Sequence, residues 1–128
     1  MVSPHDVKAL VLVGDPGIAD AVETQLKKRS YDVVIFSEKG KALSFLKEKS
    51  PHLAVVGDIG ENVSPFETMK DIVMNSPMTS IILITGPPKN EVDDKAEGYG
   101  ILGHVDTDVP SDDLVSLLEN FETITSVK

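Results

Sequence analysis

Short apolar runs alternate along the chain with stretches in which apolar residues recur at helical spacing. The runs cover residues 9–13, 33–36, 53–56, 81–84 and 101–105, and they are rich in β-branched side chains. Each run is too short for a buried helix, so the pattern predicts β-strands. The first, third and fourth runs are apolar without alternation, which is typical of central parallel strands covered on both faces.

The stretches between the runs predict amphipathic helices, because their apolar residues fall on one helical face. The predicted stripes are Ile18, Ala21, Val22 and Leu26; Ala42, Leu43, Phe45 and Leu46; Phe66, Met69, Ile72 and Val73; and Leu114, Leu117, Leu118 and Phe121.

The residues around these stripes predict where the helices begin and end. Ser37 is expected to cap the second helix, and Ser64 followed by Pro65 the third. Asp112 and Asp113 place negative charge in the first turn of the last helix, which we expect to end near Phe121. A further short helix is predicted at residues 92–97.

Strand and helix alternate five times in this pattern. Such alternation implies a parallel sheet with right-handed crossovers and helices on both faces. We therefore predict an α/β chain with a flavodoxin-like, doubly wound, five-stranded parallel sheet in the order 2-1-3-4-5. Residues 1–128 are expected to form a single domain, since this length suits one domain.

Composition narrows the possible functions. The chain has 12 Lys and Arg against 21 Asp and Glu, a formal charge of -9, which argues against binding to a nucleic-acid backbone. It has no cysteine, so disulfides, thiolate metal sites and cysteine nucleophiles are excluded. No apolar run approaches the length of a membrane span, and the first residues do not resemble a signal peptide. We expect a cytoplasmic protein that binds neither nucleic acid nor membrane.

Ligands of open α/β sheets bind at the carboxyl ends of the strands. The segments to examine are therefore 14–17, 57–60, 85–88 and 106–108. Around them the chain, from about Val7 to Phe121, resembles the receiver domain of bacterial response regulators. Segments 15–33, 51–67 and 80–86 match the family's corresponding elements without a gap, and Thr85 matches its conserved threonine.

The resemblance does not extend to the phosphorylation site. Receivers use an acidic pair after the first strand to hold Mg²⁺, an aspartate after the third to accept a phosphoryl group, and a lysine after the fifth. Carboxylates suit a hard cation, and the cation neutralises the charge of the phosphate. In this sequence the acidic pair aligns with Val13 and Gly14, the phosphoacceptor with Gly57, and the lysine with Thr107.

Asp15 and Asp58 each lie one residue beyond an expected acidic position. A slip of one residue in a strand turns a side chain to the opposite face, so these residues are poor substitutes. They are either loop and helix-entry acids or a metal and phosphoryl site with shifted geometry. Four aspartates near the missing lysine would also repel a phosphate: Asp106, Asp108, Asp112 and Asp113.

Three functions remain open. The leading hypothesis is a receiver-like module of a two-component phosphorelay that is not an enzyme, needs no cofactor and acts through protein contacts without phosphorylation. The resemblance implies a histidine kinase, an effector domain or a second copy as partner. The contact face would span residues 92–121 on the fourth helix, fifth strand and fifth helix. It would include His104, which aligns with the family's rotating aromatic, together with Asp106 and Asp108.

The second hypothesis is a phosphoryl-accepting receiver that uses Asp58, with Mg²⁺ held at Asp15. The third is a small-anion-binding domain of the same fold, with backbone N–H groups at segment 14–17 facing the anion.

Overall fold

The computed structural model describes residues 6–60, 64–85, 101–106 and 112–125. Within these ranges five parallel strands form one sheet in the order β2-β1-β3-β4-β5, as predicted. The strands are β1 (Lys8–Leu12), β2 (Asp32–Phe36), β3 (Leu53–Val56), β4 (Ser80–Ile84) and β5 (Gly103–Val105). The fifth run of the sequence therefore becomes a strand only in its last three residues.

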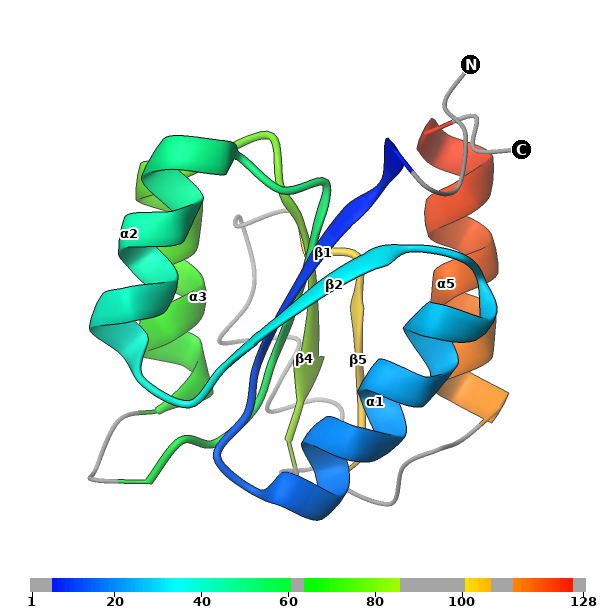
Figure 1. Cartoon of the computed structure of the whole chain (residues 1–128), viewed down its shortest axis with the longest axis horizontal. Helices are drawn as coiled ribbons and strands as arrows, with labels where there is room; N and C mark the ends of the chain where they lie inside the picture. Colours follow the sequence, from blue (N-terminus) through cyan, green and yellow to red (C-terminus); the bar gives the residue numbers. More distant parts are fainter. Residues whose placement is uncertain (1–5, 61–63, 86–100, 107–111, 126–128) are drawn as a thin grey trace.

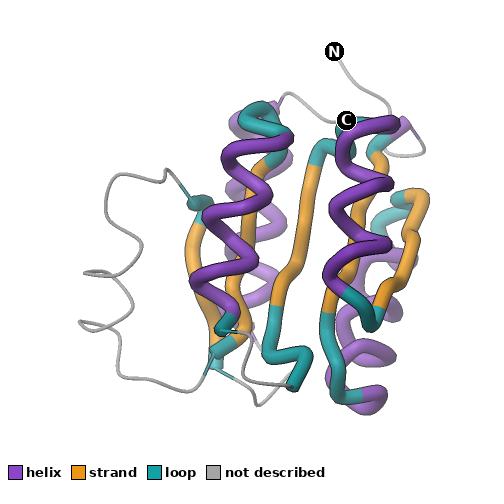
Figure 2. Tube along the Cα trace, turned by 90° about the vertical axis from the view of Figure 1, so that its left-hand side faces the viewer, coloured by secondary structure: helices purple, strands orange, loops and turns teal. Residues whose placement is uncertain are grey.

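Two layers of helix cover the sheet, one on each face (Figure 1). The helices are α1 (Pro16–Lys28), α2 (Lys39–Lys49), α3 (Pro65–Asn75) and α5 (Asp112–Thr125). Helices α1 and α5 lie on one side of the sheet and α2 and α3 on the other, and Figure 2 shows the same layers from the side. The helix predicted at residues 92–97 lies outside the described residues.

The alternation of side chains along the central strands divides the core into two clusters. Ala9 and Val11 of β1 face α1 and α5, whereas Leu10 and Leu12 face α2 and α3. Consecutive residues of the central strands, which face opposite sides of the sheet, are fully buried, and this confirms that β1, β3 and β4 are covered on both faces: Leu10 and Val11, Ala54 and Val55, and Ile82 and Leu83.

Two predicted helix boundaries were wrong. The N-cap residue of helix α2 is Glu38, not Ser37, and its side chain makes no capping hydrogen bond. Glutamate is not among the short polar residues that cap helices well. Helix α5 continues past Phe121 to Thr125. Its last turn is supported by the Thr125 hydroxyl, which donates to the Phe121 carbonyl at 2.7 Å. Ser64 and Pro65 begin α3 as expected, with the Ser64 hydroxyl accepting from the Phe66 N–H.

A polar cluster fastens α5 to the turn between α1 and β2. The Tyr31 hydroxyl donates to Glu122 at 2.7 Å, and the Arg29 guanidinium forms an ion pair with the same carboxylate. The Tyr31 ring also meets the Phe121 ring edge-on, with centroids 6.1 Å apart. Burial and then the hydrogen bond to Glu122 raise the pKa of Tyr31 well above its usual value. We call Arg29, Tyr31, Phe121 and Glu122 the α5 clasp.

Candidate functional site

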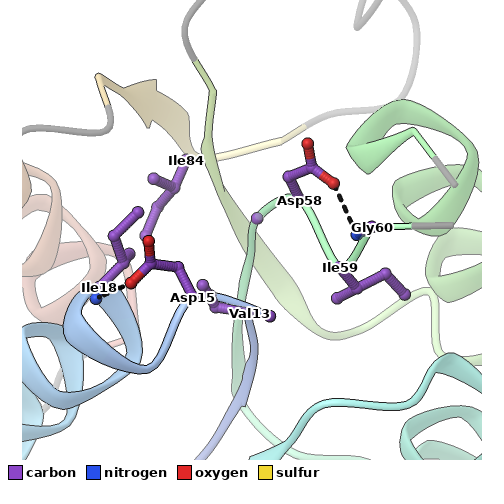
Figure 3. Close-up of a pocket in the computed structure, with 9 residues that line it drawn as sticks. Val13, Asp15, Ile18, Asp58, Ile59, Gly60 and Ile84 are labelled. Carbon is purple, nitrogen blue, oxygen red and sulfur yellow. Dashed lines mark hydrogen bonds between the residues drawn. The ribbon is translucent and has the colours of Figure 1, made fainter. Parts of the chain in front are cut away.

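A pocket of about 410 Å³ opens at the carboxyl ends of β1, β3 and β4. This is where ligands of open α/β sheets bind. The loops after β1 and β3 form its two sides, and Ile84 at the end of β4 contributes to its lining (Figure 3). The lining consists of Val13, Gly14, Asp15, Ile18, Gly57, Asp58, Ile59, Gly60 and Ile84.

Backbone hydrogen bonds hold the two loops of the pocket against each other. The Gly57 N–H donates to the Leu12 carbonyl at 2.9 Å, which continues the pairing of β1 and β3 beyond the strands. The Gly14 N–H then donates to the Asp58 carbonyl, also at 2.9 Å. A Cβ atom at Gly14 would lie only 3.0 Å from the Ile59 Cα, so this close approach requires glycine.

Val13 occupies the space beside the position that resembles the phosphoacceptor. Val13 is 3% exposed and belongs to the core cluster under α1 and α5. A Cβ atom at Gly57 would lie 3.3 Å from the Val13 Cγ2 and 3.6 Å from the Ile84 carbonyl oxygen. A Cβ atom at position 57 would therefore press against the Val13 side chain at the wall of the pocket, and a carboxylate held against this wall without a partner is unfavourable.

The two nearby carboxylates belong to local turns. Asp15 is the N-cap of α1 and accepts hydrogen bonds from Gly17 at 2.8 Å and Ile18 at 3.2 Å. Asp58 is exposed and accepts from the Gly60 N–H at 2.7 Å, in a turn where Gly60 has a φ of 78°. In Figure 3 the Asp15 carboxylate turns towards the start of α1, and the Asp58 carboxylate turns towards Gly60.

The residues of the pocket do not fit a receiver-type magnesium site. Asp15 and Asp58 are the acids in its lining, and each already accepts from the backbone of its own turn. Among the described residues no three His, Cys, Asp or Glu side chains gather where they could hold a metal ion. No lysine or arginine is present in the described lining either, so a phosphoryl group would face negative charge.

The remaining predicted site residues lie apart from this pocket or outside the described residues. Thr85 follows β4, is 8% exposed, and donates its N–H to the Val105 carbonyl at 3.0 Å. His104 is half-buried in β5 and pairs with Leu83, so it lies on the sheet face covered by α2 and α3. Asp106 is exposed just after β5. Thr107 and Asp108 lie outside the described residues.

Two features of the structure were missed in the sequence, and only the first belongs to the pocket. One is the space between position 57 and Val13, which depends on how closely β1 and β3 approach. The other is the α5 clasp, whose members are separated by 91 and 93 positions along the chain. The alternation of side chains along β1 could have indicated that Val13 faces the same side of the sheet as Val11. No short-range sequence pattern indicates that Tyr31 contacts Glu122.

No family model and no curated protein matches the sequence. Solved structures do match its fold. A CheY-like receiver domain protein from Methanospirillum hungatei has a TM-score of 0.79 and 19% identity, covering 94% of this chain and 97% of that chain. The chemotaxis protein CheY4 of Vibrio cholerae has a TM-score of 0.78 and 19% identity, with coverages of 90% and 98%.

The signal receiver domain of a modulated diguanylate cyclase from Desulfovibrio desulfuricans is also similar, with a TM-score of 0.76 and 21% identity over 93% of this chain and 95% of that chain. At these identities the likeness establishes the fold. The chain has the flavodoxin-like fold of CheY-type receiver domains. Within the described residues no helix is long and apolar enough to cross a membrane.

Proposed function

We propose that the protein is a receiver-like signalling module of a two-component phosphorelay that works through protein contacts and is not phosphorylated on aspartate. The observation that carries this proposal is the state of position 57. Gly57 offers no carboxylate there, and Val13 fills the adjoining space. A receiver switches because the acyl phosphate changes the relative free energies of two states of the domain. Without a carboxylate at position 57, that ligand-dependent difference is lost in the proposed module.

The turns around Asp15 and Asp58 support the same proposal. To act as nucleophile, Asp58 would have to leave its hydrogen bond to Gly60, and Asp15 would have to give up the cap of α1 to bind Mg²⁺. Loss of an N-cap costs about 1 kcal/mol of helix stability. Each step adds to the barrier for phosphorylation.

The proposed contact face consists of the fourth helix expected from the sequence, β5 and α5, and the residues proposed for it are His104, Asp106 and Asp108, the last of which lies outside the described residues. The exposed residues of α5 include Asp112, Asp113 and Glu119, so this face is acidic. The α5 clasp supports a surface that keeps one conformation, since it ties the end of α5 to the body of the domain by a buried tyrosine and an ion pair. The partners we propose are a histidine kinase, an effector domain or a second copy.

Phosphorylation can be tested directly by intact mass. The protein would be treated with acetyl phosphate and Mg²⁺ beside a receiver domain that accepts phosphoryl groups from this donor. We expect the control to gain one phosphoryl group and this protein to gain none. A gain that Asp58→Asn removes and Asp106→Asn leaves intact would contradict the proposal and establish Asp58 as the acceptor.

Amide NMR spectra with beryllofluoride and Mg²⁺ provide a second measurement that does not depend on the phosphoryl donor. We expect the Gly57, Asp58 and Thr85 amides to keep their positions. Shifts at these amides that require both reagents and disappear in Asp15→Ala would favour the phosphorylated alternative. Shifts with inorganic phosphate alone would instead favour the anion-binding alternative.

A further inference from the structure

Among the residues that the structure describes, the outer edge of β2 has no strand paired with it. The order β2-β1-β3-β4-β5 places β2 at one edge of the sheet, where β1 is its sheet neighbour. In Figure 1, β2 crosses the front of the molecule and no described element lies over it. Proteins usually guard such an edge with charged side chains, above all lysine, or with proline. The strand reads Asp-Val-Val-Ile-Phe, so its one charged residue is Asp32 at the first position, and it has neither lysine nor proline.

A second pocket, of about 430 Å³, lies beside this edge against the first two turns of α1. Ile35 of β2 forms part of its wall and is 40% exposed, an unusual exposure for an apolar strand residue of this chain. Val33 packs in the core cluster under α1, so Ile35, two residues later, points to the same face. The lining consists of Val13, Gly14, Pro16, Ala19, Asp20, Glu23, Ile35 and Ser37.

The charged residues of this second pocket are both acidic. Glu23 forms an ion pair with Lys27 at 3.0 Å. Asp20 is exposed and forms no ion pair with any residue that the structure describes. An acidic group beside an apolar wall favours a ligand with a basic group next to an apolar one.

We propose that the edge of β2 and the pocket beside Ile35 form a docking site for an extended, basic segment of a partner protein. The segment pairs with β2 as a sixth strand, places an apolar side chain against Ile35, and places a lysine or arginine near Asp20. Backbone pairing supplies much of the affinity in this mode of recognition, and the side-chain pocket supplies the selectivity. The site lies at the edge of the sheet opposite β5 and does not depend on whether Asp58 accepts a phosphoryl group.

The test begins with a library of random twelve-residue peptides, selected on the immobilised protein and then measured by fluorescence anisotropy. We expect the selected peptides to combine alternating apolar residues with lysine or arginine, and to bind more weakly as salt is added. Acidic peptides, peptides predicted to be helical, or a selection that enriches nothing would overturn the proposal.

Variants of the protein locate the binding site. Ile35→Lys removes the apolar wall and is expected to weaken binding about tenfold or more, since burial of such a side chain contributes about 1.5 kcal/mol or more. Asp20→Asn is expected to weaken peptide binding about threefold, which is the effect of losing an exposed ion pair. Ile124→Lys is the matched control, because Ile124 is an exposed isoleucine on α5, with 64% exposure. Equal weakening by the control would overturn the proposal.

Strand pairing itself is tested by methylating the peptide backbone. A strand presents alternate amides to its neighbour, so methylation of one alternate set should abolish binding and methylation of the other should leave it intact. If methylation of either set has the same effect, the peptide does not bind as a strand, and the proposal is overturned.

Sedimentation of the free protein tests whether a second copy of the chain occupies the site. A dimer that Ile35→Lys dissociates would replace the proposed partner segment.

Discussion

The close approach of Val13 to position 57 predicts a measurable penalty for placing an acidic side chain there. Gly57→Ala adds only a Cβ atom, and Gly57→Asp adds the same atom with a carboxylate. The backbone at Gly57 is not among the described positions with positive φ, so both side chains are sterically allowed by the main chain. Any large difference between the two variants therefore reports on the carboxylate.

The expected magnitudes follow from the neighbours of that Cβ atom. Gly57→Ala gains about 0.4–1 kcal/mol from the lower entropy of the unfolded chain. It loses a similar amount through the 3.3 Å contact with Val13, so its stability should remain within about 1 kcal/mol of the parent. Gly57→Asp makes the same Cβ contact and adds a carboxylate at the pocket wall beside Val13 and the Ile84 carbonyl oxygen. An unpaired polar group there costs about 1–3 kcal/mol more.

Urea unfolding of the two variants at neutral and acidic pH is the assay. Burial raises the pKa of the introduced carboxyl group in the folded state, so the folded form favours the protonated acid. The penalty is therefore complete at neutral pH, fades as the pH falls through the raised pKa of the folded state, and is smallest below the unfolded aspartate pKa of about 3.9, where the carboxyl is protonated in both states. Val13→Ala in the same backgrounds should reduce the difference by making room for water. Equal stability of the Ala and Asp variants at neutral pH would refute the reasoning.

Two further predictions concern packing around α5. Tyr31→Phe removes the hydroxyl that donates to Glu122 and should lower the free energy of unfolding by about 1 kcal/mol. The pKa of Tyr31 is raised in the folded state. Its contribution to the free energy of unfolding is therefore complete below the unfolded tyrosine pKa, about 10, and declines above it. When urea unfolding is followed to high pH, this part of the alkaline loss of stability should be missing in Tyr31→Phe. Gly103→Ala would bring a Cβ atom to 2.5 Å from the Leu117 Cδ2. Thermal unfolding should show that the free energy of unfolding falls by about 1–3 kcal/mol, and adding Leu117→Ala to Gly103→Ala should restore part of that loss.

The controls for these two predictions separate local from general effects. Glu122→Gln keeps a hydrogen-bond acceptor for Tyr31 but removes the ion pair with Arg29, so it should retain an alkaline decline that Tyr31→Phe lacks. An identical pH dependence in the parent and Tyr31→Phe would contradict the role of the clasp. For Gly103, an alanine variant as stable as the parent would mean that Leu117 shifts without loss of packing.

The strands and most helices could be predicted from the sequence because their signals are local. Unbroken apolar runs identify β1, β3 and β4, and the pattern of Ser64 and Pro65 identifies the start of α3. The shorter β5 is less clear, because Ile101 and Leu102 pack into the core while only the following residues join the sheet. Core burial and strand pairing leave the same apolar signal in the sequence.

The site was only partly predictable, since its properties depend on contacts between separate loops. The sequence indicates that Asp15 and Asp58 are out of register, and it suggests turn roles for both. The hydrogen bond between the Gly14 N–H and the Asp58 carbonyl, which draws the two loops together, has no local signature. The edge position of β2 is also a property of the assembled sheet, because only the strand order makes β2 an edge.

The division of the core between the two faces of the sheet has a consequence for synthesis on the ribosome. The fully buried members of the cluster under α2 and α3 are all present once Leu83 has been added. The cluster under α1 and α5 lacks Leu114, Leu118 and Phe121 until the last helix emerges. One half of the domain can therefore consolidate while α1 still exposes Val22 and Leu26, and this apolar stripe is the surface that a nascent chain must protect from aggregation.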